Sequence, residues 1–233
     1  MLSLSQRPSL SRLVSPSPSD RGFSYRLATP DDREQIREGL ERWFFPEESV
    51  SCGHRDGPQY AEEDMASMLE VLECGVVIMV IDESSGSLAG FTGCSLIRSG
   101  YVEELMETAK SAKSKKFKDI CLFMAHCTGN ADIFGRFQVE TALQVQYVMV
   151  FPNYRGLKIS RAMVEKSVEI ARRLGAGAIY GDCTSPLMAR SFQSVGIPCI
   201  YRMAYSDYRD ENEEIVFKSQ PNYEHLHCHA MKL

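Results

Sequence analysis

The stretch YVMVFPNYRGLKIS, residues 147–160, decides the fold. Its apolar first half predicts a buried strand, and the apolar residues from Leu157 to Leu174 recur at helical spacing. A short loop containing Arg155 and Gly156 joins the two elements. A loop that opens a helix presents several free main-chain N–H groups and the positive end of the helix dipole together. The stretch therefore predicts an anion site suited to a diphosphate, and a plain connection that binds nothing is the alternative.

The elements around this stretch change rhythm halfway along the chain. In the first half, two apolar runs joined by Glu83–Ser87 predict an antiparallel hairpin, whereas alternating strands and helices in the second half imply parallel pairing. We expect one α/β domain with a mixed twisted sheet of about six or seven strands and helices on both faces. The basic run Lys110–Lys118 is interpreted as a solvated face or loop. Strands are expected at 23–28, 76–82, 88–96, 142–150, 178–182, 199–206 and 225–231, and helices after Thr29 and at 60–74, 102–128, 157–174 and 186–194.

The composition argues against several functional classes. The 233 residues carry a formal net charge of -5, which disfavours nucleic acid as the main partner because phosphate binding needs a surplus of Lys and Arg. No apolar run approaches about 18 residues, so we expect no membrane span. Eight cysteines without a CxxC spacing indicate reduced thiols and a cytoplasmic location. Nothing in the sequence points to an obligate protein partner.

The first residues differ in composition from the rest. Ser and Pro alternate in Ser15–Ser19, and this bias predicts a disordered tail at 1–22 followed by a folded domain at 23–233. The tail is also rich in Ser and has Arg but no acidic residue before Asp20, as transit peptides do. Organelle targeting is therefore the alternative, although several prolines oppose an amphipathic helix.

The loop and helix start resemble a cofactor motif. The pattern V-x-P-x-Y-R-G-x-x-I, which begins at Val150, is similar to the acetyl-CoA signature Gln/Arg-x-x-Gly-x-Gly/Ala of the GNAT acetyltransferases. Arg155 matches the first position, whereas Lys158 stands at the second invariant position, a glycine in the signature, and Ser160 replaces Gly or Ala. The resemblance implies a GNAT fold and acetyl-CoA as co-substrate. The residues expected to hold the cofactor are Met149, Val150, Arg155, Gly156, Leu157, Lys158, Ile159 and Ser160.

Further segments resemble one subgroup of that family. They occur in the order seen in insect-type arylalkylamine N-acetyltransferases, which include dopamine and serotonin acetylators. The resemblance implies that the second substrate is the primary amine of a small molecule, of the arylalkylamine class. The segments are WFFPEE at 43–48, DIF at 132–134, DCTS at 182–185, YSDY at 205–208 and VFK at 216–218.

A carboxylate is the expected general base. A primary amine with a pKa of about 10 leaves only about one molecule in a thousand neutral at pH 7, so a base must take its proton. Resemblance to the family segment Phe-x-Asp-Glu-Pro assigns this role to Glu48, with Glu47 as the second choice. Two solvated acids at a helix end are the alternative. The resemblance also implies that a main-chain N–H of Met149 or Val150 polarises the thioester carbonyl.

The departing thiolate needs a proton donor. The related enzymes have Cys-Ser-Ser-x-Tyr-Ser-Ala-Arg, and residues 183–190 of this chain are CTSPLMAR. Thr184 keeps a hydroxyl at the first serine position, but Met188 has lost the second one and cannot donate. Thr184, Ser185, a tyrosine such as Tyr201, or water is expected to take this role.

A histidine-rich strand predicted near the C-terminus resembles a metal site. His225, His227 and His229 share one face of the expected strand, and Cys228 points to the other. Imidazoles from a single strand rarely converge on a tetrahedral ion without a ligand from elsewhere, so we expect no metal.

The substrate and the degree of activity leave alternatives. An aryl-binding wall is expected from at least two aromatic residues of a larger set, although aromatics at such spacing also form cores. A polyamine or another amine is the first alternative substrate. A catalytically weak acyl-CoA-binding protein is the second alternative, because of Lys158 and Met188. The aromatic residues are Phe44, Phe45, Phe134, Phe137 and Tyr205.

Overall fold

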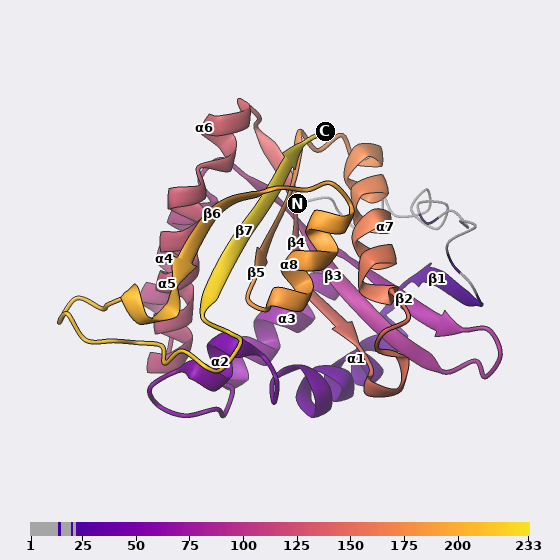
Figure 1. Cartoon of the computed structure of the whole chain (residues 1–233), viewed down its shortest axis with the longest axis horizontal. Coiled ribbons are helices and arrows are strands. Elements are labelled where there is room, and N and C mark those ends of the chain that lie inside the picture. Colours follow the sequence, from indigo (N-terminus) through magenta and orange to yellow (C-terminus); the bar gives the residue numbers. More distant parts are fainter. Residues whose placement is uncertain (1–13, 15–19, 21) are drawn as a thin grey trace.

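A seven-stranded sheet forms the centre of the molecule (Figure 1). The computed structural model describes residues 14, 20 and 22–233. The strand order is β1-β2-β3-β4-β5-β7-β6, and helices cover both faces, as the sequence predicted. The strands are β1 Phe23–Leu27, β2 Val76–Asp82, β3 Leu88–Arg98, β4 Thr141–Val150, β5 Ala178–Cys183, β6 Cys199–Ala204 and β7 His225–Lys232.

The helices fall into two groups by the face of the sheet that they cover. One face packs against α7 and α8, and the other packs against α1, α3, α5 and α6. The helices are α1 Arg33–Gly39, α2 Ser49–Gly53, α3 Glu62–Cys74, α4 Tyr101–Ser111, α5 Lys115–Ala131, α6 Ile133–Phe137, α7 Ile159–Arg173 and α8 Pro186–Ser194. Short helical turns lie at η2 Pro30–Asp32, η3 Leu40–Phe44, η4 Pro152–Tyr154 and η5 Tyr205–Asp207.

Parallel pairing is confined to one pair of strands. β4 and β5 run parallel, but their pairing covers only 142–144 against 178–180. The predicted parallel arrangement of the second half is wrong beyond that pair, because β7 inserts antiparallel between β5 and β6. The two strands of the β6–β7 pair are joined by a long excursion rather than by a helix that crosses the sheet, so they can pair antiparallel.

Local capping explains where several helices begin. The carboxylate of Asp32 accepts hydrogen bonds from the main-chain N–H of Thr29 (2.7 Å) and from its hydroxyl (3.1 Å), which fixes the predicted start of the first helical segment. Ser114 accepts from the N–H of Phe117 and starts α5, so the expected helix at 102–128 is split into α4 and α5. The sequence analysis missed the five-residue helices α2 and α6.

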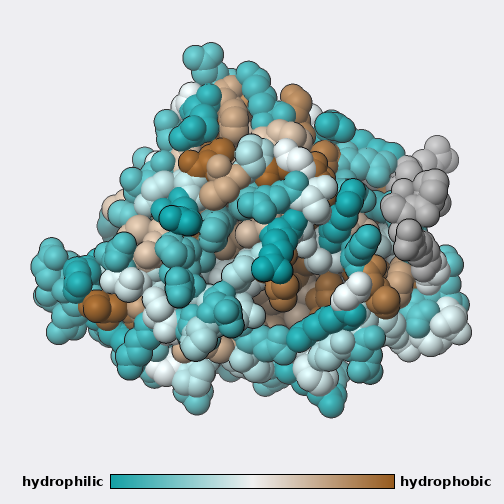
Figure 2. Space-filling model, in the orientation of Figure 1, coloured by the Kyte–Doolittle hydropathy of each residue, from teal (hydrophilic) through white to brown (hydrophobic). Residues whose placement is uncertain are grey.

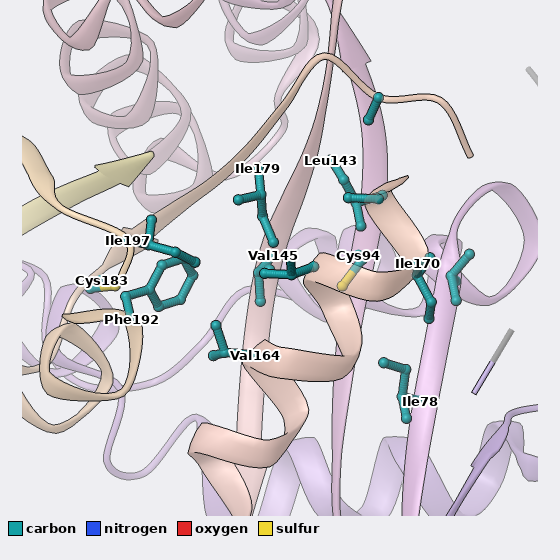
Figure 3. Packing of buried hydrophobic residues seen from close by; sticks show 14 of the residues in the cluster. Ile78, Cys94, Leu143, Val145, Val164, Ile170, Ile179, Cys183, Phe192 and Ile197 are labelled. Atoms are coloured by element: carbon teal, nitrogen blue, oxygen red, sulfur yellow. The ribbon is translucent and has the colours of Figure 1, made fainter. Parts of the chain in front are cut away.

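The packing of α7 holds the loop before it in place. Figure 3 shows Val164 and Ile170 of α7 beside strand residues that include Val145, Cys94 and Ile78. Val164 and Ile170 are fully buried, and each such side chain contributes about 1.5–3 kcal/mol of hydrophobic stabilisation. The N-terminus of α7 is therefore anchored to the sheet through its apolar face.

One residue of the basic run Lys110–Lys118 contradicts the expectation of a solvated face. Lys116 is buried, and its ammonium donates to the carbonyl oxygens of Ser51 (2.8 Å), Gly57 (2.7 Å) and Gln59 (2.6 Å). Three acceptors satisfy the three N–H donors of the ammonium, so its burial is compensated. This contact fixes α2 and the loop after it against α5.

Other expectations concern the cysteines, the membrane and the first residues. All eight cysteines are free thiols, and five of them are buried. Within the described residues, no helix is both long and apolar enough to cross a bilayer. Most of the tail predicted at 1–22 lies outside the described residues. Asp20 is described, and its carboxylate pairs with Lys166 of α7 at 3.3 Å.

Candidate active site

A cavity of about 630 Å³ crosses the sheet where β4 and β5 separate. The first turns of α7 and α8 line it from one face, and α2, α3, α4 and α5 line it from the other. Figure 2 shows a hollow on the α7 and α8 face, with hydrophobic side chains inside and hydrophilic ones around it. Every residue predicted for catalysis or cofactor binding lines this cavity except Leu157, whose side chain is exposed, and Tyr201.

The gap between β4 and β5 exposes main-chain groups of β4. A bulge at Gln146 shifts the register with β3, after which regular antiparallel pairing resumes at Tyr147. The N–H of Phe151 donates to Ala89 of β3 (2.9 Å). Because antiparallel pairing alternates, the N–H of Met149 also faces β3, whereas the N–H of Val150 faces the gap. Of the two donors expected from the sequence, the geometry favours Val150.

The loop between η4 and α7 presents a group of free donors. Within the described part of the chain, the main-chain N–H groups of Gly156 to Arg161 donate to no protein acceptor. Gly156 has φ +82°, and an added Cβ there would meet no atom within 4 Å. Lys158 caps α7 with φ 63°, a conformation that costs a non-glycine residue roughly 1 kcal/mol. The loop therefore has the donor-only geometry of an anion site.

Arg155 and Ser160 lie at the two ends of this donor group. The Nε of Arg155 donates to the carbonyl of Val150 (3.3 Å), and its guanidinium pairs with the carboxylate of Glu47 (2.9 Å). Both partners of that ion pair are about half exposed, so the pair contributes little to stability. The hydroxyl of Ser160 bonds to the hydroxyl of Ser191 (2.9 Å), which joins α7 to α8 beside the cavity.

Glu48 is held by the helix that it starts. One carboxylate oxygen accepts from the N–H of Val50 (3.0 Å) and the other accepts from the N–H of Ser51 (2.7 Å). The carboxylate is half-buried, lines the cavity and keeps lone pairs free for a further donor. Glu47 is exposed and engaged with Arg155. The geometry therefore suits Glu48 better than Glu47 for contact with an amine.

The hydroxyl groups proposed from sequence differ in their placement. Thr184 and Ser185 line the cavity, and the Ser185 hydroxyl accepts from the N–H of Met188 while keeping its own proton available. Tyr201 does not line the cavity, and its hydroxyl donates to the sulfur of Met203 (3.6 Å). Of the protein groups expected to protonate the thiolate, the structure leaves Thr184 and Ser185.

The aromatic lining differs from the expected set. Phe44 and Phe45 line the cavity, whereas Phe134, Phe137 and Tyr205 belong to the core on the α5 side of the sheet. Other aromatic residues take their place from η3, α4, α5 and β4. They are Trp43, Tyr101, Phe117 and Tyr147.

Two hydrogen-bond acceptors in the cavity wall, on Asp182 and Gln144, were not predicted together from the sequence. Asp182 of β5 accepts from the hydroxyl of Tyr180 and from the thiol of Cys228 (3.0 Å), both through Oδ1. Its Oδ2 and the Oε1 of Gln144 of β4 are buried, and neither accepts a hydrogen bond within the described residues. Burial raises the pKa of Asp182 to about 6. An acid at the end of an apolar strand was the only sequence signal available.

The buried phenol of Tyr205 is influenced by the carboxylates of both Glu48 and Asp182. Burial, with further contributions from the negative charges of Glu48 and Asp182, raises the pKa of Tyr205 well above its ordinary value. Its hydroxyl donates to the carbonyl of Thr184 (3.0 Å). Glu48 and Asp182 therefore both act on one buried phenol and line the same cavity, although they come from distant parts of the chain.

The mixed sheet, the bulged β4 and the open anion site at α7 define an N-acetyltransferase of the GNAT fold, the class that the motif at 150–159 predicted. No protein-family model matches the sequence. The chain is similar to a solved mosquito arylalkylamine N-acetyltransferase-like protein, 5b, with 29% identity over 91% of this chain and 100% of that one, at a TM-score of 0.87.

Two further solved structures share the fold. The Drosophila melanogaster polyamine N-acetyltransferase, which forms N-acetylagmatine, is 23% identical over 91% of this chain and 100% of that one, with a TM-score of 0.85. The Arabidopsis thaliana NAA60, solved with acetyl-CoA, is 13% identical over 91% of this chain and 98% of that one, with a TM-score of 0.54. The GNAT fold is thereby confirmed.

Proposed function

We propose that this protein transfers the acetyl group of acetyl-CoA to the primary amine of a small molecule. The observation that carries the proposal is a single cavity whose wall holds both free main-chain donors and an anchored carboxylate. The donors are the free N–H groups at the start of α7, from Gly156 to Arg161, and the carboxylate is that of Glu48. The diphosphate of the cofactor suits the donors, and an ammonium group suits the carboxylate.

Glu48 is the proposed base. The incoming ammonium gives a proton to Glu48, directly or through one water, and the neutral nitrogen then attacks the thioester carbonyl. Without a base, the scarcity of neutral amine at pH 7 costs roughly 4 kcal/mol. The two main-chain N–H groups hold the carboxylate in one orientation, so its free lone pairs are presented to the cavity.

The other steps use groups at the β4–β5 gap. The N–H of Val150 stabilises the negative charge that forms on the carbonyl oxygen, a contribution of about 2.7–4 kcal/mol when the donor is well aimed. The C–S bond then breaks, and the CoA thiolate takes a proton from the hydroxyl of Thr184 or Ser185, which regains a proton from solvent in the same step. The second proton of the nitrogen leaves to solvent, so that the products are an amide and CoA.

An arylalkylamine is the proposed substrate class. The wall of the cavity on the α2 and α4 side is rich in aromatic rings, including Trp43, Phe44 and Tyr101. An apolar aromatic wall in the same cavity as the carboxylate of Glu48 favours a ring and an amine joined by a short chain. The similarity to an arylalkylamine N-acetyltransferase-like protein supports the same class.

An amine with a second cationic group is the other candidate. Asp182 forms no ion pair within the described residues, and its Oδ2, like the Oε1 of Gln144, is buried without a partner in the part of the cavity wall formed by β4 and β5. A buried carboxylate is normally paired, and a second ammonium or a guanidinium would satisfy both acceptors. The similarity to a polyamine N-acetyltransferase supports this candidate.

Thiol release from acetyl-CoA separates the candidates. Phenethylamine, tryptamine, putrescine and agmatine are compared with the wild type, with Asp182→Asn and with Asp31→Asn, an exposed aspartate outside the cavity. If the substrate is an arylalkylamine, kcat/KM is highest for the aryl amines and survives Asp182→Asn. If a second cation binds, agmatine or putrescine leads, and Asp182→Asn lowers its kcat/KM about tenfold or more.

Two outcomes would contradict the proposal. If acetyl-CoA binds but no amine releases CoA, a catalytically weak acyl-CoA-binding protein remains. If acetyl-CoA does not bind at millimolar concentration by calorimetry, the assignment of the N–H groups at α7 is wrong, and the acetyl-transfer function is wrong with it.

A further inference from the structure

The histidine-rich strand gains a ligand from a second strand. His227 and His229 lie on the same face of β7, and Cys199 at the start of β6 is the register partner of His229. One ligand atom from each of these three side chains lies within 4.8 Å of the other two. The sequence analysis set the metal site aside for want of a ligand from elsewhere in the chain, and Cys199 supplies that ligand.

The hydrogen bonding of the two ring nitrogens of His229 is typical of a metal ligand. The ring is fully buried, and its Nδ1 lies 2.9 Å from the carbonyl oxygen of Ile197. A carbonyl only accepts, so Nδ1 carries the hydrogen and Nε2 carries the lone pair. That Nε2 is buried with no hydrogen-bond partner in the described part of the chain. Metal-bound histidines are commonly fixed in this way, by a carbonyl that accepts from the other ring nitrogen.

His227 and Cys199 complete the set. The Sγ of Cys199 lies 3.9 Å from Nδ1 of His227. Cys199 is exposed, which leaves one side of the cluster open to solvent.

We propose that Cys199, His227 and His229 form a zinc site, with water as the fourth ligand. Zn–S bonds of about 2.3 Å and Zn–N bonds of about 2.0–2.1 Å place neighbouring tetrahedral donors about 3.5 Å apart. The donors therefore need to approach by no more than about an ångström. One thiolate with two imidazoles favours Zn²⁺ over hard cations such as Mg²⁺. On binding, the thiol proton of Cys199 passes to solvent.

The site is separate from the acetyl-transfer cavity. None of its three residues lines that cavity. The ion would join the start of β6, an edge strand, to the middle of β7, next to the register shift between Cys199 and Tyr201. We therefore expect a structural site, whose loss changes the stability of the β6–β7 pair and leaves acetyl transfer unchanged.

Cobalt and zinc titrations of the untagged full chain test the site. Co²⁺ reports a bound thiolate by its charge-transfer absorption and tetrahedral geometry by its visible bands, and Zn²⁺ should displace it. The variants are Cys199→Ser and His227→Gln, with Cys74→Ser as the control, because Cys74 is exposed and lies outside the cluster. Near-ultraviolet circular dichroism checks that each variant is folded.

The wild type and Cys74→Ser should bind one equivalent of metal. Cys199→Ser should lose the charge-transfer band, and both cluster variants should bind at least about tenfold more weakly. Zinc should raise the melting temperature of the wild type but not of Cys199→Ser. Equal affinity and equal spectra for Cys199→Ser and the wild type would overturn the site, as would the absence of any tetrahedral thiolate spectrum, since the bound ion would then be adventitious only.

Discussion

Two regions of the active-site cavity carry opposite hydrogen-bonding character. At the start of α7, the main-chain N–H groups of Gly156 to Arg161 offer only donors, and Arg155 adds a positive charge. Around Tyr205, the carboxylates of Glu48 and Asp182 offer only acceptors. Under the proposed function, the donor region would hold the anionic cofactor and the acceptor region would hold the cationic amine, so the cavity would sort its two substrates by charge.

The largest expected effect tests the acceptor region. Glu48→Gln removes the proposed base, and we expect kcat/KM at neutral pH to fall about 100-fold or more, because an amide cannot take a proton from the ammonium. Acetyl-CoA affinity should stay unchanged, since the donor region is intact. Thiol release and calorimetry measure the two quantities.

Glu47→Gln is the matched control for this variant. Glu47 is exposed and pairs only with Arg155, so its loss should change kcat/KM by less than about threefold. If Glu48→Gln keeps the wild-type rate, or if the two variants lose activity equally, the assignment of the base to Glu48 is wrong.

An intermediate effect concerns the burial of Asp182. Its pKa of about 6 in the folded chain lies above the value of about 3.9 in the unfolded chain, so the folded state binds the proton more tightly. The contribution of this group to stability is full below about pH 4 and is lost as the pH rises through about 6. The free energy of unfolding of Asp182→Asn, relative to that of the wild type, should therefore increase by about 2 kcal/mol between pH 4.5 and pH 7.5.

Urea unfolding of both proteins at the two pH values measures this difference. Asp31→Asn should show no such pH-dependent gain, since Asp31 is exposed. A constant difference between Asp182→Asn and the wild type at both pH values would contradict the strained burial of this carboxylate and weaken the case for a cationic ligand there.

The smallest effect tests the donor region. Lys158 adopts φ 63°, and Lys158→Gly relieves this strain while adding conformational freedom to the unfolded chain. We expect a net gain in unfolding free energy of about 0.5 kcal/mol. Lys158→Ala keeps the unfavourable φ and should show no gain. The midpoint of urea unfolding distinguishes them, and a loss of stability in Lys158→Gly would mean that the lysine side chain stabilises the loop.

The donor region could be predicted from sequence because it is contiguous. The strand, the loop with Gly156 and the helix follow one another, so periodicity and a short motif locate them together. The acceptor region could not be predicted in the same way. Asp182 and Gln144 line the same cavity as Glu48 only because β4, β5 and α2 pack around one gap. The spacing of these residues along the chain does not reveal this arrangement.

The same distinction explains the errors in the fold. The hairpin of β2 and β3 has a short turn, and the prediction of it is confirmed. The insertion of β7 between β5 and β6 depends on long-range pairing, which local alternation misrepresents as parallel. Lys116 was assigned to a solvated run because its neighbours are polar, yet its three carbonyl acceptors come from residues more than fifty positions away.

The short pairing of β4 with β5 makes this boundary the most weakly paired part of the sheet. Within the described residues, strands β1–β4 are joined to β5–β7 by the pairing of 142–144 with 178–180 and by a hydrogen bond from the N–H of Gly177 to the carbonyl of Thr141 (3.0 Å). A cofactor lying in the gap would bridge the two sets of strands and suppress their relative opening. Amide deuterium exchange at 178–180 should then slow on addition of acetyl-CoA, while exchange at the β2–β3 hairpin stays the same.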